Sequence, residues 1–117
     1  MRIQVKRVYD AKEEGDGLRI LVDRLWPRGV SKDAGAFDLW LKEVAPSPVL
    51  RQWFGHDPDK WSEFRSRYES ELRGNSQAVE RLEEAIGTAR ATLLYAAKDT
   101  RHNHAVALRD FLMKRQG

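Results

Sequence analysis

The 117-residue sequence has no cysteine, only four prolines and no long uninterrupted apolar run. The lack of cysteine excludes disulfides, thiol nucleophiles and thiolate metal sites, and it fits a reducing, cytoplasmic compartment. No stretch approaches the roughly 20 apolar residues that a membrane span requires, and the opening MRIQVKRVYD lacks the apolar part of a secretory signal. Neither sign of charge dominates, because 21 basic and 18 acidic residues leave a net charge of +3. That bias is too small to identify a nucleic-acid-binding protein.

Motifs of several well-known chemistries are missing as well. The sequence contains no GxGxxG, no Walker A loop and no GxSxG, which argues against a dinucleotide or P-loop enzyme, and we expect no cofactor. It also has no HExxH motif and no cysteine pair, so we predict no metal site. The alternative is that a metal ion does bind, and its ligands would then be His102 and His104 with Asp99 or His56.

What is present predicts one α/β domain over residues 1–117. Hydrophobic residues make up 41% of the chain, enough for a single core. Apolar runs predict strands over residues 3–9, 18–26 and 91–98, whereas residues 37–44 are ambiguous between a strand and a helical turn. Capping residues and apolar stripes predict helices that begin near Ser47, Asp57, Ser76 and Asn103.

The expected architecture is a small, mostly parallel sheet of three or four strands packed with helices. The segment DAKEEGDG, residues 10–17, joins the first two predicted strands. Its eight residues are fewer than the dozen or more of a usual parallel crossover. We therefore expect the first two strands to pair antiparallel.

The strongest signal for a functional site is the segment DTRHNH, residues 99–104, between a predicted buried strand and the last helix. Ligands of open α/β sheets collect at the carboxyl ends of strands, and a helix N-terminus attracts anions. A histidine here would serve as general acid or base, with Asp99 or Asp23 setting its tautomer. Alternatively, Asp99 or Asn103 only caps the helix and the histidines face solvent. The candidate catalytic residues are His102, His104 and Asp99, and the candidate ligand-binding residues of this segment are Arg101 and Asn103.

A second charged cluster, DRLWPRG, covers residues 23–29 at the end of the second predicted strand. Adjacent charges within a strand need partners, because burying an unpaired charge is costly. One interpretation is an ion pair of Asp23 with Arg28 or Arg7. The other is that Arg24 and Arg28 form a clamp for a phosphate or carboxylate, with Asp23 as support.

A third region, WFGHD at residues 53–57, offers aromatic rings that could stack on a base or sugar. Aromatic residues at helical spacing are more often part of the core, and His56 would then be only a helix-entry residue.

The strings VDRLWPRGVSK (22–32), DLWLKEVAPSPVLRQWFGHDP (38–58) and TLLYAAKDTRHNHA (92–105) resemble the YeaO-like branch of the domain-of-unknown-function 488 family. The resemblance covers nearly the whole chain. It implies a small bacterial or archaeal protein with an α/β core, and it brings no established activity. The matching positions are Asp23, Arg24, Trp26, Pro27, Arg28 and Gly29 in the first signature and Tyr95, Lys98, Asp99, Asn103 and His104 in the last.

These features together predict binding of a small anionic or nucleotide-like ligand, with catalysis by a histidine left open. The alternative is a nucleic-acid-binding or transcription-associated module, although no recognition helix stands out. We expect no membrane partner, and the sequence does not indicate an oligomeric state. The ligand hypothesis requires that two charged segments about seventy residues apart, carrying Arg28 and His102, lie side by side.

Overall fold

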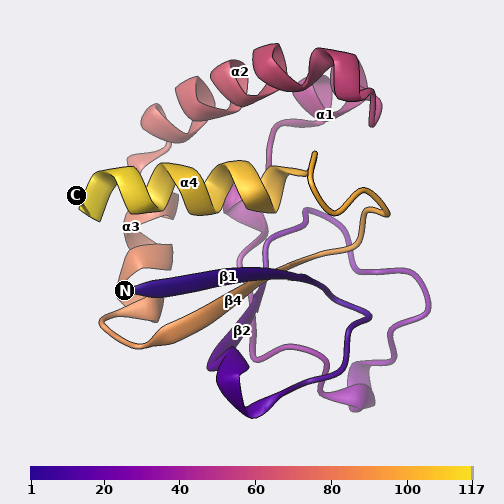
Figure 1. Cartoon of the computed structure of the whole chain (residues 1–117), viewed down its shortest axis with the longest axis vertical. Helices are drawn as coiled ribbons and strands as arrows, with labels where there is room; N and C mark the ends of the chain where they lie inside the picture. The colour runs from indigo at the N-terminus through magenta and orange to yellow at the C-terminus, as the bar shows by residue number, and fades with distance from the viewer. Residues whose placement is uncertain (117) are drawn as a thin grey trace.

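The computed structural model describes residues 1–116, which form an α/β fold with one four-stranded sheet (Figure 1). The strands are β1 (Arg2–Arg7), β2 (Leu18–Leu21), β3 (Leu39–Trp40) and β4 (Arg90–Tyr95). The helices are α1 (Pro48–Phe54), α2 (Trp61–Arg73), α3 (Ser76–Ile86) and α4 (His104–Gln116). All strand pairs are parallel, in the order β1-β4-β2-β3, so the predicted α/β class is confirmed.

The predicted antiparallel pairing of the first two strands is wrong. β1 and β2 do not pair with each other, because β4 lies between them and both run parallel to it. Val5 of β1 and Ile20 of β2 both lie opposite Leu93 of β4. The short connection suffices because it carries no α-helix, only a single 3₁₀ turn at Glu14–Asp16. A minimum length based on helical crossovers does not apply to such a loop.

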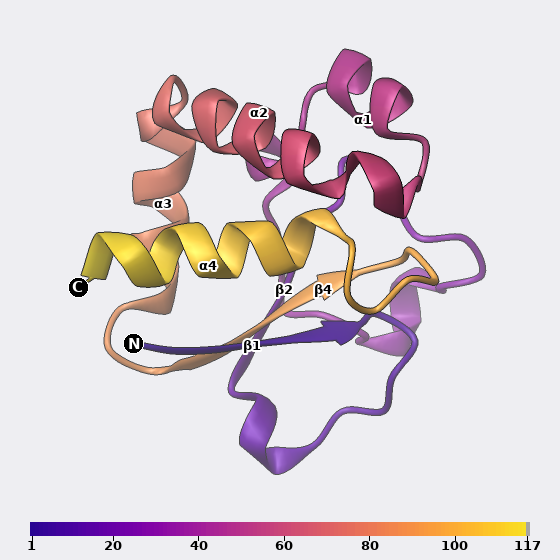
Figure 2. The ribbon, with the colours of Figure 1, turned by 45° about the horizontal axis from the view of Figure 1, so that its top comes forward.

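The two faces of the sheet are covered differently. Alternation along the strands turns Ile20 and Leu93 toward the main core and Leu21 and Leu94 toward a smaller apolar cluster on the other face. The main core contains residues of all four helices, with α4 lying along the sheet and α2 packed beyond it (Figure 2). The smaller cluster is completed by residues of the segment between β2 and β3, including Phe37.

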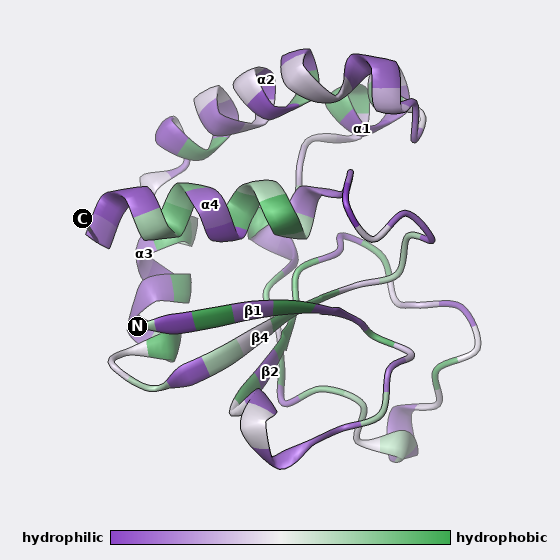
Figure 3. Cartoon of the chain, in the orientation of Figure 1, coloured by the Kyte–Doolittle hydropathy of each residue, from purple (hydrophilic) through white to green (hydrophobic). Residues whose placement is uncertain are grey.

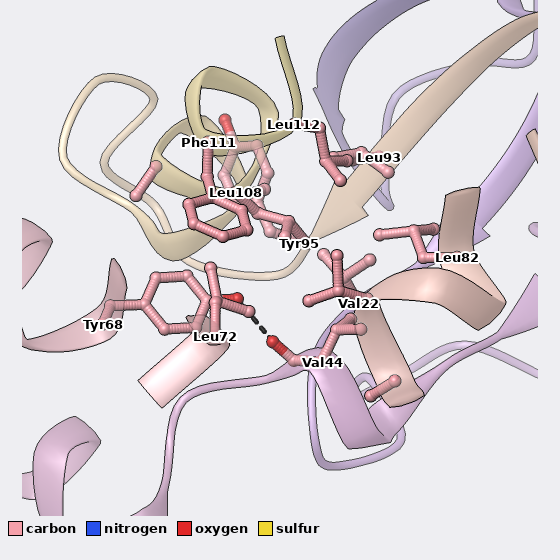
Figure 4. Close-up of a cluster of buried hydrophobic side chains, with 14 of the residues drawn as sticks. Val22, Val44, Tyr68, Leu72, Leu82, Leu93, Tyr95, Leu108, Phe111 and Leu112 are labelled. Carbon is pink, nitrogen blue, oxygen red and sulfur yellow. Dashed lines mark hydrogen bonds between the residues drawn. The ribbon is translucent and has the colours of Figure 1, made fainter. Parts of the chain in front are cut away.

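The helix stripes follow the predicted periodicity. On α2, Phe64, Tyr68 and Leu72 are buried, while Trp61 is half-buried. The Tyr68 hydroxyl donates a hydrogen bond to the Val44 carbonyl inside the core (Figure 4). Figure 3 shows mostly polar residues on the outer side of α2, as expected of a helix that buries one stripe.

Several predicted boundaries differ in detail. Asp57 caps a 3₁₀ turn at Pro58–Lys60, and α2 itself begins only at Trp61. Ser76 is the first residue of α3 and not its cap, which is Asn75. The ambiguous segment 37–44 contains both alternatives, because β3 is followed by a 3₁₀ turn at Lys42–Val44. Within residues 1–116, no helix combines the length and the apolar character needed to cross a membrane.

Candidate ligand-binding site

Loops that leave the carboxyl ends of β2 and β4 form the candidate site. β2 ends at Leu21 and β4 at Tyr95, several residues earlier than predicted. The charged segment 23–29 is therefore a loop, and the prediction that the second strand extends to residue 26 is wrong. Because all four strands are parallel, their carboxyl ends lie at one edge of the sheet.

A cavity of about 400 Å³ lies at this edge. Segments that follow each of the four strands contribute to its walls. Its polar and aromatic lining includes Tyr9, Asp23, Arg24, Trp26, Arg28, Arg51, Phe54, His56, His102, Asn103 and His104, and Leu25 is one of its apolar lining residues. The two charged segments therefore meet at one cavity, and Arg28 and His102 do not lie on opposite faces of the molecule.

Not every candidate residue faces the cavity. Arg101 is exposed and is not part of the lining. Asn103 lines it, but both polar atoms of its side chain are used within the fold. Its Nδ2 donates to the Asp99 carbonyl at 3.0 Å, and its Oδ1 accepts from the Val106 N–H at 3.0 Å as the cap of α4.

Asp99 lies behind His102 and orients its ring. Oδ1 of Asp99 accepts the backbone N–H groups of Arg101 and His102, each at 2.9 Å, and Oδ2 lies 2.9 Å from Nδ1 of His102. These backbone hydrogen bonds, and then the His102 side chain, lower the pKa of Asp99 to about 2. An ionised carboxylate only accepts, so Nδ1 of His102 carries the hydrogen. The Nε2 lone pair of the neutral ring is then left for a ligand or a water molecule.

The lowered pKa of Asp99 makes a testable contribution to stability. A carboxyl whose pKa falls on folding stabilises the native state above its unfolded value of 3.8, and this contribution disappears as the pH falls toward 2. Asp99→Asn keeps an acceptor for the N–H groups but cannot titrate. In denaturant unfolding between pH 5 and pH 2, we expect the wild type to lose stability more steeply than Asp99→Asn. Parallel curves for the two proteins would contradict this assignment.

The second histidine has a different environment. Nε2 of His104 lies 3.1 Å from the Val22 carbonyl and 3.1 Å from Oδ1 of Asp23. A carbonyl can only accept, so Nε2 carries the hydrogen and is not available as a base. Oδ2 of Asp23 accepts the Ala96 N–H at 3.0 Å. Asp23 and His104 thus connect the ends of β2 and β4 to the start of α4.

The predicted ion pair of Asp23 with Arg28 or Arg7 is wrong. Arg7 instead donates to the carbonyls of Ala96 and Ala97, at 3.1 and 2.9 Å. The Asp23 carboxylate instead accepts the Ala96 N–H, just after β4, and lies beside His104.

Three arginines line the cavity, and none has an ion-pair partner among residues 1–116. Arg24 reaches the carbonyls of Ala45 and Pro46, each at 3.3 Å, while its buried Nε has no hydrogen-bond partner in the described structure. Arg28 and Arg51 are exposed at the cavity wall. Among the described residues that line the cavity, Asp23 alone carries a carboxylate.

Sequence reasoning missed two of these lining residues. Arg51 lies on α1, where an arginine reads as an ordinary solvated side chain, and Tyr9 follows the first strand without any motif. From the third predicted region, Phe54 and His56 line the cavity, whereas Trp53 does not. Trp53 is partly buried against the main core and packs between Lys60 and Arg67, with its ring centre 5.2 and 4.4 Å from their charged groups.

Among the described residues, no three His, Asp or Glu side chains are grouped as a metal ion would require. His102 and His104 each have a separate aspartate partner, Asp99 and Asp23 respectively.

The sequence model of the "Inactive DUF488-N3 subclade" matches residues 2–116. The chain belongs to this family. The resemblance inferred from the LWPRG and LLYAAKD strings is thereby confirmed. The chain is 48% identical to "Uncharacterized protein YeaO" of Escherichia coli over 112 residues, covering 96% of this chain and 97% of the relative. It is 40% identical over 111 residues to "Uncharacterized protein Rv3073c" of Mycobacterium tuberculosis, covering 95% and 93%. No solved structure gives a significant match.

Proposed function

We propose that this chain is a cytoplasmic protein that binds a small ligand bearing a phosphate or carboxylate group in the cavity at the strand ends. The observation that carries the proposal is the convergence of Arg24, Arg28 and Arg51 on one cavity without an ion-pair partner among residues 1–116. Arginines held close together repel each other, and an anion relieves that repulsion. The guanidinium group also matches phosphate and carboxylate oxygens with paired hydrogen bonds.

The position and size of the cavity support this proposal. Ligands of open parallel sheets bind outside the carboxyl ends of the strands, where this cavity lies. Its volume of about 400 Å³ is within the ~300–1,000 Å³ range of small-molecule sites. The N-terminus of α4 adjoins it through Asn103 and His104, and the dipole of that helix favours negative charge there.

We favour binding over catalysis. None of the residues that line the cavity is a serine, threonine, cysteine or lysine, so the lining offers none of these nucleophiles. The family description contains the word "inactive", which agrees with binding without turnover. The second candidate function is general-base catalysis by His102, favoured by its hydrogen bond to Asp99. In that case, prolonged incubation of a bound phosphate ester with the protein would release phosphate.

The experiment is a calorimetric titration with ribose 5-phosphate and inorganic phosphate. We expect Arg28→Ala and Arg51→Ala each to weaken binding about 10- to 100-fold, as the loss of a charge-assisted hydrogen bond implies. Both side chains are exposed, so the melting temperature should stay within a few degrees of the wild type. Arg24 is less suitable because it also holds the segment before α1.

Arg81→Ala on α3 is the matched control, since Arg81 is exposed and lies outside the cavity. It removes the same charge and should leave binding almost unchanged. The proposal fails if the wild type binds neither compound at millimolar concentration. It also fails if Arg28→Ala and Arg51→Ala bind no more weakly than the control.

A further inference from the structure

The cavity has an apolar rim as well as a charged wall. The structure has six exposed large hydrophobic side chains within residues 1–116, and three of them line this cavity. They are Tyr9, Leu25 and Trp26, with exposures of 45%, 59% and 37%. Apolar side chains that gather at one place on a surface mark a binding site more often than isolated ones do.

The Tyr9 ring is held in place by its surroundings. Its hydroxyl donates a hydrogen bond of 2.8 Å to the Arg28 carbonyl, which connects it to the loop that carries Arg28. The guanidinium group of Arg7 lies 4.9 Å from the ring centre and covers one face. The residue is still 45% exposed and lines the cavity, so part of the ring surface is accessible to a ligand.

Trp26 is fixed in a similar way. Its Nε1 donates to the Val30 carbonyl at 2.7 Å, and its ring centre lies 5.1 Å from that of Phe37 and 5.6 Å from that of Trp40, both edge to face. The polar atoms of both aromatic side chains, the Tyr9 hydroxyl and Trp26 Nε1, are thus already bonded to backbone carbonyls. What Tyr9 and Trp26 offer a ligand is ring surface.

We propose that the ligand is a nucleoside monophosphate, whose phosphate contacts Arg28 and Arg51 and whose base packs on Tyr9 and Leu25. This inference rests on the proposed anion-binding function. A charged wall beside a rigid aromatic rim fits a molecule with an anionic end and a flat apolar end. The volume of about 400 Å³ lies near the lower limit of small-molecule sites, which favours a mononucleotide over a dinucleotide. Stacking tolerates any base, so no strong preference among the four is expected.

The test compares AMP with ribose 5-phosphate, which has the same sugar and phosphate without the base. In calorimetric titrations of the wild type we expect AMP to bind about 5- to 100-fold more tightly, the range typical of one stacked base. Tyr9→Ser should remove most of this advantage, and its loss of the hydroxyl bond to the Arg28 carbonyl is shared with the control Tyr9→Phe. Tyr9→Phe, which keeps the ring, should retain the advantage, and Leu25→Ser should reduce it to a smaller extent.

Val49→Ser is the control for loss of an exposed apolar side chain, because Val49 is 79% exposed on α1 and lies outside this cavity. Equal affinities for AMP and ribose 5-phosphate would overturn the nucleotide inference and leave the anion-binding function intact. An AMP advantage that survives both Tyr9→Ser and Leu25→Ser would overturn the assignment of the base to this rim. Binding of neither compound would overturn both proposals.

Discussion

Asp16→Ala is expected to lower the free energy of unfolding by about 3–5 kcal/mol, the cost of removing one partner from a buried ion pair. Asp16 and Arg19 are both only 2% exposed, and NH1 of Arg19 lies 2.6 Å from Oδ2 of Asp16. Lys6 lies 3.1 Å from the same carboxylate, and Gln4 donates to it at 3.0 Å. Without Asp16, the guanidinium of Arg19 stays buried with its charge uncompensated.

This cluster also holds the short β1–β2 connection in place. Arg19 donates to the Asp10 carbonyl at 3.1 Å, and Lys6 donates to the Ala11 carbonyl at 2.9 Å. Burial alone would raise the pKa of Asp16, but hydrogen bonds from the Glu13 N–H, Arg19 and Lys6 outweigh it and lower the pKa. The charge of Asp16 is therefore part of what fixes the loop across the face of β4.

Urea unfolding at neutral pH tests this prediction, with Glu13→Ala as the control. Glu13 pairs with the same Lys6 at 2.9 Å, but its side chain is 73% exposed. An exposed ion pair contributes only about 0–1 kcal/mol, so the control should remain close to the wild type. If the two variants lost the same free energy of unfolding, burial of the Asp16–Arg19 ion pair would add nothing to stability, and the prediction would be wrong.

Gly17→Ala is expected to lower the free energy of unfolding by about 1–3 kcal/mol more than Gly87→Ala does, which is the usual cost of overpacking. Both glycines have a backbone conformation that L-residues rarely adopt, with φ and ψ of 62° and −138° at Gly17 and 59° and −132° at Gly87. The strain of roughly 1–3 kcal/mol is therefore common to both variants. Only at Gly17 would the added Cβ also clash, because it would lie 2.3 Å from the Arg90 carbonyl oxygen.

The clash arises from the close approach of β2 and β4. Gly17 directly precedes β2, whose first residue, Leu18, lies opposite Ala91 of β4. At Gly87 the nearest atom to an added Cβ is 4.0 Å away, so that variant reports the strain alone. Denaturant unfolding of the two variants side by side gives the difference directly. Equal stabilities would mean that the backbone at Arg90 moves aside at little cost.

The strands and the site loops were predictable where a local pattern carries the information. The apolar run at 91–98 predicts a buried strand, and residues 90–95 form β4, one of the two interior strands of the sheet. Charged residues directly after apolar runs marked segments 23–29 and 99–104, and parallel strands bring such segments to one edge. The position of β4 between β1 and β2 was not predictable, because it depends on contacts between residues far apart in sequence.

The partners of individual side chains could not be read from the sequence. Asp23 binds the Ala96 N–H and His104 and not an arginine, which depends on β2 ending at Leu21. The two histidines look alike in the segment RHNHA, yet Nε2 of His104 bonds the Val22 carbonyl, whereas Nε2 of His102 bonds none of residues 1–116. The place of Arg51 in the cavity wall could be recognised only from the three-dimensional structure, since nothing in the sequence of α1 distinguishes this arginine from an ordinary solvated one.

The residues that line the cavity come from distant parts of the chain, from Tyr9 near the N-terminus to His104 near the C-terminus. No isolated piece of the polypeptide can build it, so it exists only when folding is complete. An occupant therefore favours the finished fold alone, and at a hundred times its dissociation constant it adds about 2.7 kcal/mol to stability. For a chain of this size, the supply of a small molecule in the cell would then help to decide how long the protein survives.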